Sequence, residues 1–236
     1  LVLFHLSALP IERLKISIKP YEKGIFYMNT PDYDTVGGYA EASFIEKKSE
    51  FIGYITHAET DEEAVAFINE IRGRHRKATH NVYAYILRNG SITRYSDDGE
   101  PQGTAGVPVF EVLRKEGLTD VCCVVTRYFG GILLGGGGLV RAYSHSAKIA
   151  VDAAERKKMC SCYPMEITSD YGLYGKIVNI LPEFEVKITD TVFETDVTVK
   201  LLCRSALTDA LTEKLIDTAN GKITVHKGEE GFENFT

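Results

Sequence analysis

The sequence predicts an α+β protein of two domains. Segments with strand and helix patterns alternate around several apolar runs, and the last third has the order β-α-β-β-α-β. Charge also changes along the chain. Residues 1–163 carry equal numbers of basic and acidic side chains, whereas residues 164–236 carry 7 Lys and Arg against 13 Asp and Glu. The net charge of −6 therefore comes from the last third, which argues against that part gripping a nucleic-acid backbone by bulk charge.

Three segments are expected. Residues 1–27 form an uncertain leader or extension, because composition changes near Met28. Residues 28–160 form the N-terminal domain and residues 161–236 the C-terminal domain. With 236 residues, of which 44% are hydrophobic, the chain is long enough to build two separate cores.

The N-terminal domain opens with a strand and a helix. FIGYITHA, residues 51–58, is rich in β-branched and aromatic side chains, and the following Thr60-Asp61-Glu62-Glu63 is typical of a capping box. Apolar residues then recur at helical spacing up to Ile71. The helix ends in a basic run that predicts either a solvated helix end or a binding surface: Arg72, Arg74, Arg76 and Lys77.

A hairpin and a buried strand follow. Residues 80–87 alternate in the manner of a strand, and Asn89-Gly90 indicates a tight turn into residues 91–96. A short helix is expected from Pro108 to Gly117, and the continuous apolar run at residues 121–126 predicts a buried strand. The Ala-rich residues 139–157 predict a long helix.

The C-terminal domain is predicted as a compact unit. Strands are expected at residues 164–170, 185–189, 193–203 and 222–227, with one helix after the first strand and one before the last. This order is that of the split-βαβ, ferredoxin-like plan.

The segment TRYFGGILLGGGGLVRAYSHSAK, residues 126–148, places six glycines between Arg127 and Arg141. Backbone amides before a helix attract anions, but the spacing fits neither a Walker A loop nor a dinucleotide fingerprint. Glycines alone also permit tight backbone crossings. They do not explain the two arginines, whose guanidinium groups match carboxylate or phosphate.

The loop SDDGEPQGTAG gathers Asp97, Asp98 and Glu100. The spacing is not that of an EF-hand, and a structural or acceptor role is favoured over metal binding. A triad of Ser96, His80 and Asp97 can be drawn, but no known nucleophile motif supports it.

Five cysteines form no recognisable disulfide framework or zinc pattern, so they are expected to be reduced structural thiols in a cytoplasmic protein. No apolar run is long enough to span a membrane, and no cofactor or metal is predicted.

THNVYAY, RYSDDGEPQGTAGVPVFEVL and LTDVCCVVTRYFGGILLGGGGLVRAYSHSAK resemble the Impact family, which includes the YigZ-like proteins of bacteria. The resemblance covers residues 40–155, and the acidic residues 164–230 look like the second domain of the bacterial members. The chain departs from the family pattern at Val107, where a basic residue is usual. The resemblance implies that the first domain has a fold shared with ribosomal-protein and elongation-factor domains, with helices on one face of the sheet and a left-handed βαβ crossover.

The resemblance also implies a noncatalytic cytosolic regulator linked to translation, which binds a ribosome-associated protein or RNA. The alternative is an enzyme, such as a hydrolase, that acts on an anionic small molecule or peptide between the SDDGEP and TRYFGG loops. The absence of a recognisable nucleophile and base favours binding over turnover. The partner and the oligomeric state stay open. The candidate groove residues are His80, Asn81, Ser96, Asp97, Asp98, Glu100, Thr104, Arg127, Tyr128, Gly130, Gly131 and Arg141.

Overall fold

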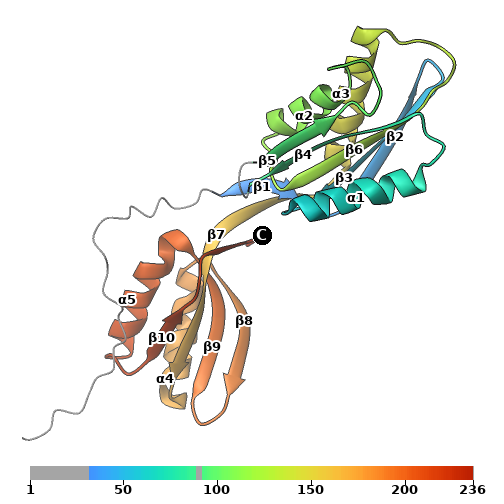
Figure 1. Cartoon of the computed structure of the whole chain (residues 1–236). Helices are drawn as coiled ribbons and strands as arrows, with labels where there is room; N and C mark the ends of the chain where they lie inside the picture. The colour runs from blue at the N-terminus through green and yellow to red at the C-terminus, as the bar shows by residue number, and fades with distance from the viewer. Residues whose placement is uncertain (1–31, 89–91, 236) are drawn as a thin grey trace, which may run out of the picture.

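The computed structural model describes residues 32–88 and 92–235. The expected leader at residues 1–27 and the Asn89-Gly90 turn lie outside these ranges. The described residues form a mixed α+β structure with two antiparallel sheets and five α-helices (Figure 1). None of its helices is both long and apolar enough to cross a membrane.

The first sheet has five strands in the order β2-β3-β6-β4-β5, and every neighbouring pair is antiparallel. The predicted hairpin is confirmed, because the fourth and fifth strands pair directly. Strand β6 occupies the centre, as its continuous apolar sequence requires. The strands are β2 (Ala40–Glu46), β3 (Ser49–His57), β4 (His80–Leu87), β5 (Ile92–Ser96) and β6 (Val121–Tyr128).

Helices cover both faces of this sheet, which corrects the expectation that they lie on one face. Helices α2 (Gly106–Lys115) and α3 (Gly136–Ala153) pack on one side with Cys123 and Val125, whereas α1 (Asp61–Arg74) packs on the other with Cys122 and Val124. Because neighbouring strand residues point to opposite faces, an uninterrupted apolar run on β6 needs a cover on each side.

The helix ends follow local sequence signals. Thr60 accepts a hydrogen bond from the Glu63 amide at 3.2 Å, as the predicted capping box requires, although the Glu63 carboxylate accepts from the Glu59 amide rather than from Thr60. Gly117, at φ 68°, follows α2 in the left-handed region. Helix α3 begins three residues before the predicted Leu139, within the glycines.

Strand β7 (Arg156–Ser169) connects the two parts of the chain. Its first residues pair with β1 (Tyr33–Val36), and its later residues pair with β9 (Val197–Arg204). The expected domain division between residues 160 and 161 thus falls within a continuous strand rather than in a loop (Figure 1).

The remaining elements complete the second sheet, whose strands run in the order β8-β9-β7-β10. Two helices pack against it and enclose a core that includes Met165, Ile177, Leu201 and Leu211. The short strand β11 pairs with the middle of β7 and was not predicted. The further elements are α4 (Tyr171–Ile180), β8 (Val186–Phe193), α5 (Thr208–Thr218), β10 (Thr224–Lys227) and β11 (Gly231–Glu233).

Candidate functional site

A buried ion pair joins the acidic loop to the central strand of the first sheet. The Arg127 Nη1 group donates to Glu100 Oε1 at 2.5 Å, and both side chains are about 95% buried, with 6% and 4% exposed. Two buried opposite charges are tolerated only when they are paired and hydrogen-bonded. Glu100 and Arg127, both candidate groove residues, are therefore brought together and paired, although the buried Arg127 Nε has no hydrogen-bond partner among the described residues.

Strand register places this pair. His80, Arg127 and Phe51 lie side by side on β4, β6 and β3, on the sheet face that α3 covers. His80 Nε2 lies 3.8 Å from Glu100 Oε1, and His80 Nδ1 lies 2.8 Å from the Asp98 carbonyl. The His80 imidazole thus lies between the Asp98 carbonyl and the Glu100 carboxylate of the acidic loop.

Two partners of the pair were missed by the sequence analysis. Tyr143 donates to Glu100 at 2.8 Å, and buried Ser49 accepts from Arg127 Nη2 at 3.4 Å. Burial, followed by the nearby Glu100 charge, raises the pKa of Tyr143. Helical spacing between Leu139 and Ala147 could have identified Tyr143 as a buried phenol in need of a partner. No comparable signal marks Ser49.

The other two carboxylates of the acidic loop also accept hydrogen bonds from groups within the protein. Asp97 accepts from the amides of Gly103, Ala105 and Gly106, so it caps the start of α2. Asp98 accepts from Arg72 and from the Asn81 amide, each at 2.7 Å. The amide of Asp98, in turn, donates to Ser96 Oγ at 3.2 Å, and Thr104 Oγ1 donates to the Pro101 carbonyl at 2.6 Å.

The glycine segment is a close backbone crossing. A Cβ at Gly130 would overlap the Lys48 carbonyl, and the Gly130 amide donates to Ser49 at 3.1 Å. Gly131 and Gly135 have φ values of 84° and 73°, which favour glycine. Glycine is thus required here for backbone reasons, without reference to a phosphate.

Several predicted groove residues lie elsewhere. Tyr128 follows Arg127 on β6, so its side chain lies on the opposite face, where its hydroxyl is 2.9 Å from His75 Nδ1. The Asn81 side chain also lies on that face and accepts from Thr126. Arg141 is exposed on α3 and has no ion-pair or hydrogen-bond partner among the described residues.

The predicted basic surface is partly neutralised. Arg72 pairs with Asp98, and Arg74 pairs with Glu70 one turn earlier in α1. Arg76 and Lys77 are exposed and make no ion pair within residues 32–88 and 92–235. Two of the four basic side chains of the predicted surface therefore lack an acidic partner in the described part of the chain.

A cavity of about 380 Å³ lies against the outer side of the Glu100–Arg127 pair. His80 and Arg127 line one part of it, and Leu133, Leu134 and Leu139 line another. The adjoining loop exposes three large apolar side chains. They are Phe129, Ile132 and Leu133, with exposed fractions of 45%, 41% and 83%.

The cysteines lie away from this cavity and are all buried as free thiols. Burial raises the pKa of the Cys123 thiol to about 12 and that of Cys122 well above its usual value. Such thiols stay protonated at neutral pH and are poor nucleophiles. Within the described ranges, no group of three or more His, Cys, Asp or Glu side chains is placed to hold a metal ion.

The chain belongs to the Impact family. Residues 47–151 match the Impact N-terminal domain, and residues 167–222 match a second domain described as of unknown function, DUF1949. The chain is 40% identical to the IMPACT family member YvyE of Bacillus subtilis over 84% of this chain and 91% of the relative. It is 31% identical to the IMPACT family member YigZ of Escherichia coli over 78% of this chain and 92% of the relative.

A solved structure shows the same overall fold. The crystal structure of a hypothetical protein aligns with a TM-score of 0.56 and 28% identity, covering 84% of this chain and 98% of that chain. The two matched family domains agree with a two-domain arrangement.

Proposed function

We propose that this protein is a noncatalytic cytoplasmic regulator of the Impact type, which acts by docking on a translation-associated protein. One observation carries the proposal. The charged groups beneath the cavity are paired with each other, whereas its rim exposes Phe129, Ile132 and Leu133. An exposed apolar cluster beside a preformed cavity is typical of a protein-binding surface.

A protein partner is favoured over RNA by the charge at the end of α1. Two of the four basic side chains at the end of α1 are neutralised within the protein. RNA binding remains the second form of the proposal, with Arg76 and Lys77 as its contacts. It predicts an affinity that falls with salt at a slope of about −0.7 per phosphate neutralised.

The enzyme hypothesis is disfavoured by how the candidate groups are used. Asp97 caps a helix, while Asp98 and Glu100 are held in ion pairs. A catalytic base must be free to accept a proton from a substrate. The groove between the SDDGEP and TRYFGG loops is better suited to binding than to hydrolysis.

The finer features of the fold remain part of the proposal. We infer an elongation-factor-like first domain with a left-handed crossover from β3 through α1 to β4, and a ferredoxin-like second domain. The sheet order β8-β9-β7-β10, with all neighbours antiparallel, supports the second assignment. The proposed domains are residues 28–160 and 161–236.

Sedimentation of ribosomes from a lysate tests the proposed docking. The wild-type protein should sediment with ribosomes or with a factor bound to them. Replacing Leu133 by Asp should abolish this association while leaving the unfolding transition unchanged, because Leu133 is 83% exposed. Ile216→Asp is the matched control, since Ile216 is an exposed apolar residue on α5.

Equal sedimentation of both variants would contradict docking through the loop. The absence of the wild-type protein from all ribosomal fractions would contradict the link to translation.

A further inference from the structure

The last described strand returns to the junction between the two sheets (Figure 1). Strand β11 pairs with Cys160–Cys162 of β7, just after the stretch of β7 that pairs with β1. Cys162 is also paired with Arg204 of β9, so β9 and β11 lie on opposite edges of β7. Strand β11 therefore lies where the chain passes from the first sheet into the second.

Side chains beside β11 bind this segment to the second sheet. The Glu230 carboxylate accepts hydrogen bonds from Ser161 on β7 and, at 2.9 Å, from Ser205, which follows β9. Glu233 pairs with Lys187 of β8 at 2.8 Å. Residues 230–233 thus contact β7, β8 and the residue after β9.

Phe232 carries the contact of this segment with the first sheet. The guanidinium carbon of Arg88 lies 4.0 Å from the centre of the Phe232 ring and 4.9 Å from the centre of the Tyr33 ring. The two ring centres are 5.1 Å apart, so one guanidinium group contacts both. A cation is attracted to the face of an aromatic ring. Arg88 directly follows β4 of the first sheet, whereas the two rings belong to strands of the second sheet.

Arg88 is held in position from within the first part of the chain. Its backbone amide donates to Asp120 Oδ1 at 2.6 Å, and its Nε donates to Asp120 Oδ2 at 3.4 Å. The Asp120 side chain is only 1% exposed, so the guanidinium group is anchored to a buried carboxylate. A side chain that is already positioned loses little conformational freedom when it stacks on a ring.

Strand β11 can separate from β7 without unfolding either sheet. It is the shortest strand among the described residues, with three residue pairs to β7 and partly exposed side chains. None of its residues belongs to the three hydrophobic cores of the described chain. Segments with few buried contacts open at a lower free energy than cores do.

We propose that residues 230–233 form a clasp that fixes the orientation of the first sheet relative to the second. With the clasp closed, as in this structure, the Phe232 ring lies against Arg88. Separation of β11 from β7 withdraws this ring, and the first sheet then turns about the start of β7. The sheets stay connected through β1, because Thr35 contacts His57 Nδ1 at 2.9 Å and donates to the Asp120 carbonyl at 3.0 Å.

This inference does not rest on the proposed docking function. None of the clasp residues lines the cavity beside Arg127, and neither does Arg88. The clasp instead sets how the two parts of the chain are oriented when any partner binds either of them.

Residual dipolar couplings of the backbone amides in the full chain test the proposal, since they report the orientation of each sheet in a weakly aligning medium. In the wild-type protein, one alignment tensor should describe both sheets. In Phe232→Ala the two sheets should require different tensors, while the amide chemical shifts of both cores stay unchanged. Phe232→Leu keeps an apolar side chain but removes the ring beneath Arg88, and it should also lose the common tensor.

Phe235→Ala is the matched control, because Phe235 lies in the same terminal segment but lines a cavity with Phe184 and Arg204. This variant should keep the single tensor. Different tensors in the wild-type protein, or a single tensor in the folded Phe232 variants, would overturn the proposal. Loss of the single tensor in Phe235→Ala would overturn it too, because Phe232 would then have no distinct role.

Discussion

Arg127 and Arg141 flank the same glycine segment but differ in their surroundings. Arg127 is buried and paired with Glu100, whereas Arg141 is exposed and unpaired within the described part of the chain. Removing one member of a buried pair leaves the other charge without compensation. The two arginines should therefore contribute very differently to stability.

Replacing Arg127 by Ala should lower the free energy of unfolding by about 3–5 kcal/mol, because Glu100 would be left as a buried, unpaired charge. Urea denaturation measures this change. Arg141→Ala is the matched control and should change stability by less than about 0.5 kcal/mol. Equal stability of the two variants would mean that the ion pair does not support the fold.

His75 gives the protein a predicted dependence on pH. Burial, followed by the nearby Arg74 charge, lowers the pKa of His75. The folded state therefore disfavours the protonated ring, and the unfolded chain takes up the proton more readily. Stability from this residue is present above about pH 6.5 and is lost as the pH falls through the lower folded pKa.

The urea midpoint should thus decrease as the pH is lowered below about 6.5. His75→Gln should reduce that decrease, although it disturbs the contacts with Tyr54 and Tyr128. His226→Gln, on exposed β10, should keep the wild-type slope. An unchanged slope in the His75 variant would show that another group controls the transition.

At the scale of elements, the crossing at Gly130 is predicted to tolerate no side chain. Gly130→Ala should destabilise the protein, because its Cβ would overlap the backbone of the β2–β3 turn. Gly175→Ala should stabilise it by about 1 kcal/mol, because Gly175 lies inside α4 with open space around its Cβ position. Thermal unfolding of both variants checks the opposite signs. Destabilisation by both substitutions would contradict the prediction that only Gly130 lacks room for a side chain.

Local patterns in the sequence predicted most elements, because helix periodicity and turn residues act over short ranges. Nonlocal features were missed. Strands β1 and β11 are short and pair with distant β7, and β2 is an edge strand that pairs only with β3; the sequence analysis predicted none of the three. It also misplaced α1, although the uninterrupted apolar run on β6 indicated cover on both faces.

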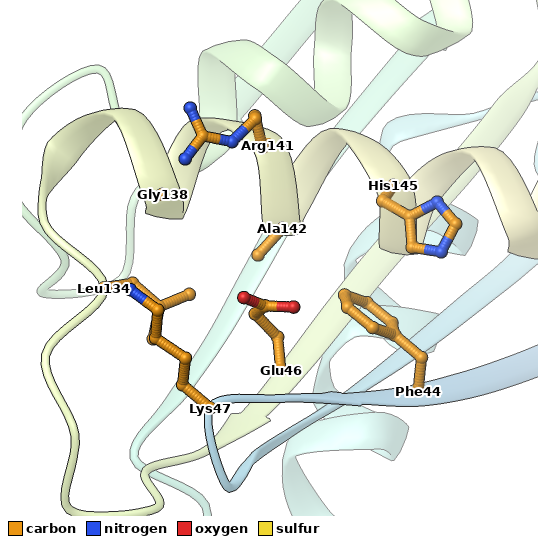
Figure 2. Close-up of a pocket in the computed structure, with 8 residues that line it drawn as sticks. All are labelled: Phe44, Glu46, Lys47, Leu134, Gly138, Arg141, Ala142 and His145. Atoms are coloured by element: carbon orange, nitrogen blue, oxygen red, sulfur yellow. The ribbon is translucent and has the colours of Figure 1, made fainter.

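The candidate site was predicted less completely than the fold. The motifs brought Glu100 and Arg127 to attention, and the two side chains do meet. Tyr128 was included among the groove residues although the alternation along β6 places its side chain on the face opposite to Arg127, where it contacts His75. Arg141 lines a different cavity (Figure 2) from Glu100 and Arg127, and its position depends on packing of α3 against the sheet, which no local pattern encodes.

For the whole molecule, the proposed division within β7 has a direct consequence for fragments. Residues 161–235 retain the part of β7 that pairs with β9 and β10, together with a separate core. This fragment should unfold cooperatively. Residues 170–235 lack β7 and should not fold. Circular dichroism during urea denaturation distinguishes them, and an unfolded 161–235 fragment would contradict the proposed division.

The central claim is that the protein binds a partner and does not catalyse a reaction, because the Glu100–Arg127 charges beneath the exposed Phe129, Ile132 and Leu133 are paired with each other. Mass spectrometry of a cytosolic metabolite and peptide extract, before and after incubation with the purified protein, tests it most directly. We expect no compound to be consumed, because Asp97, Asp98 and Glu100 are all engaged within the fold. Reproducible loss of a compound with the wild-type protein, abolished in a folded Glu100→Gln variant, would contradict the claim and establish the protein as an enzyme.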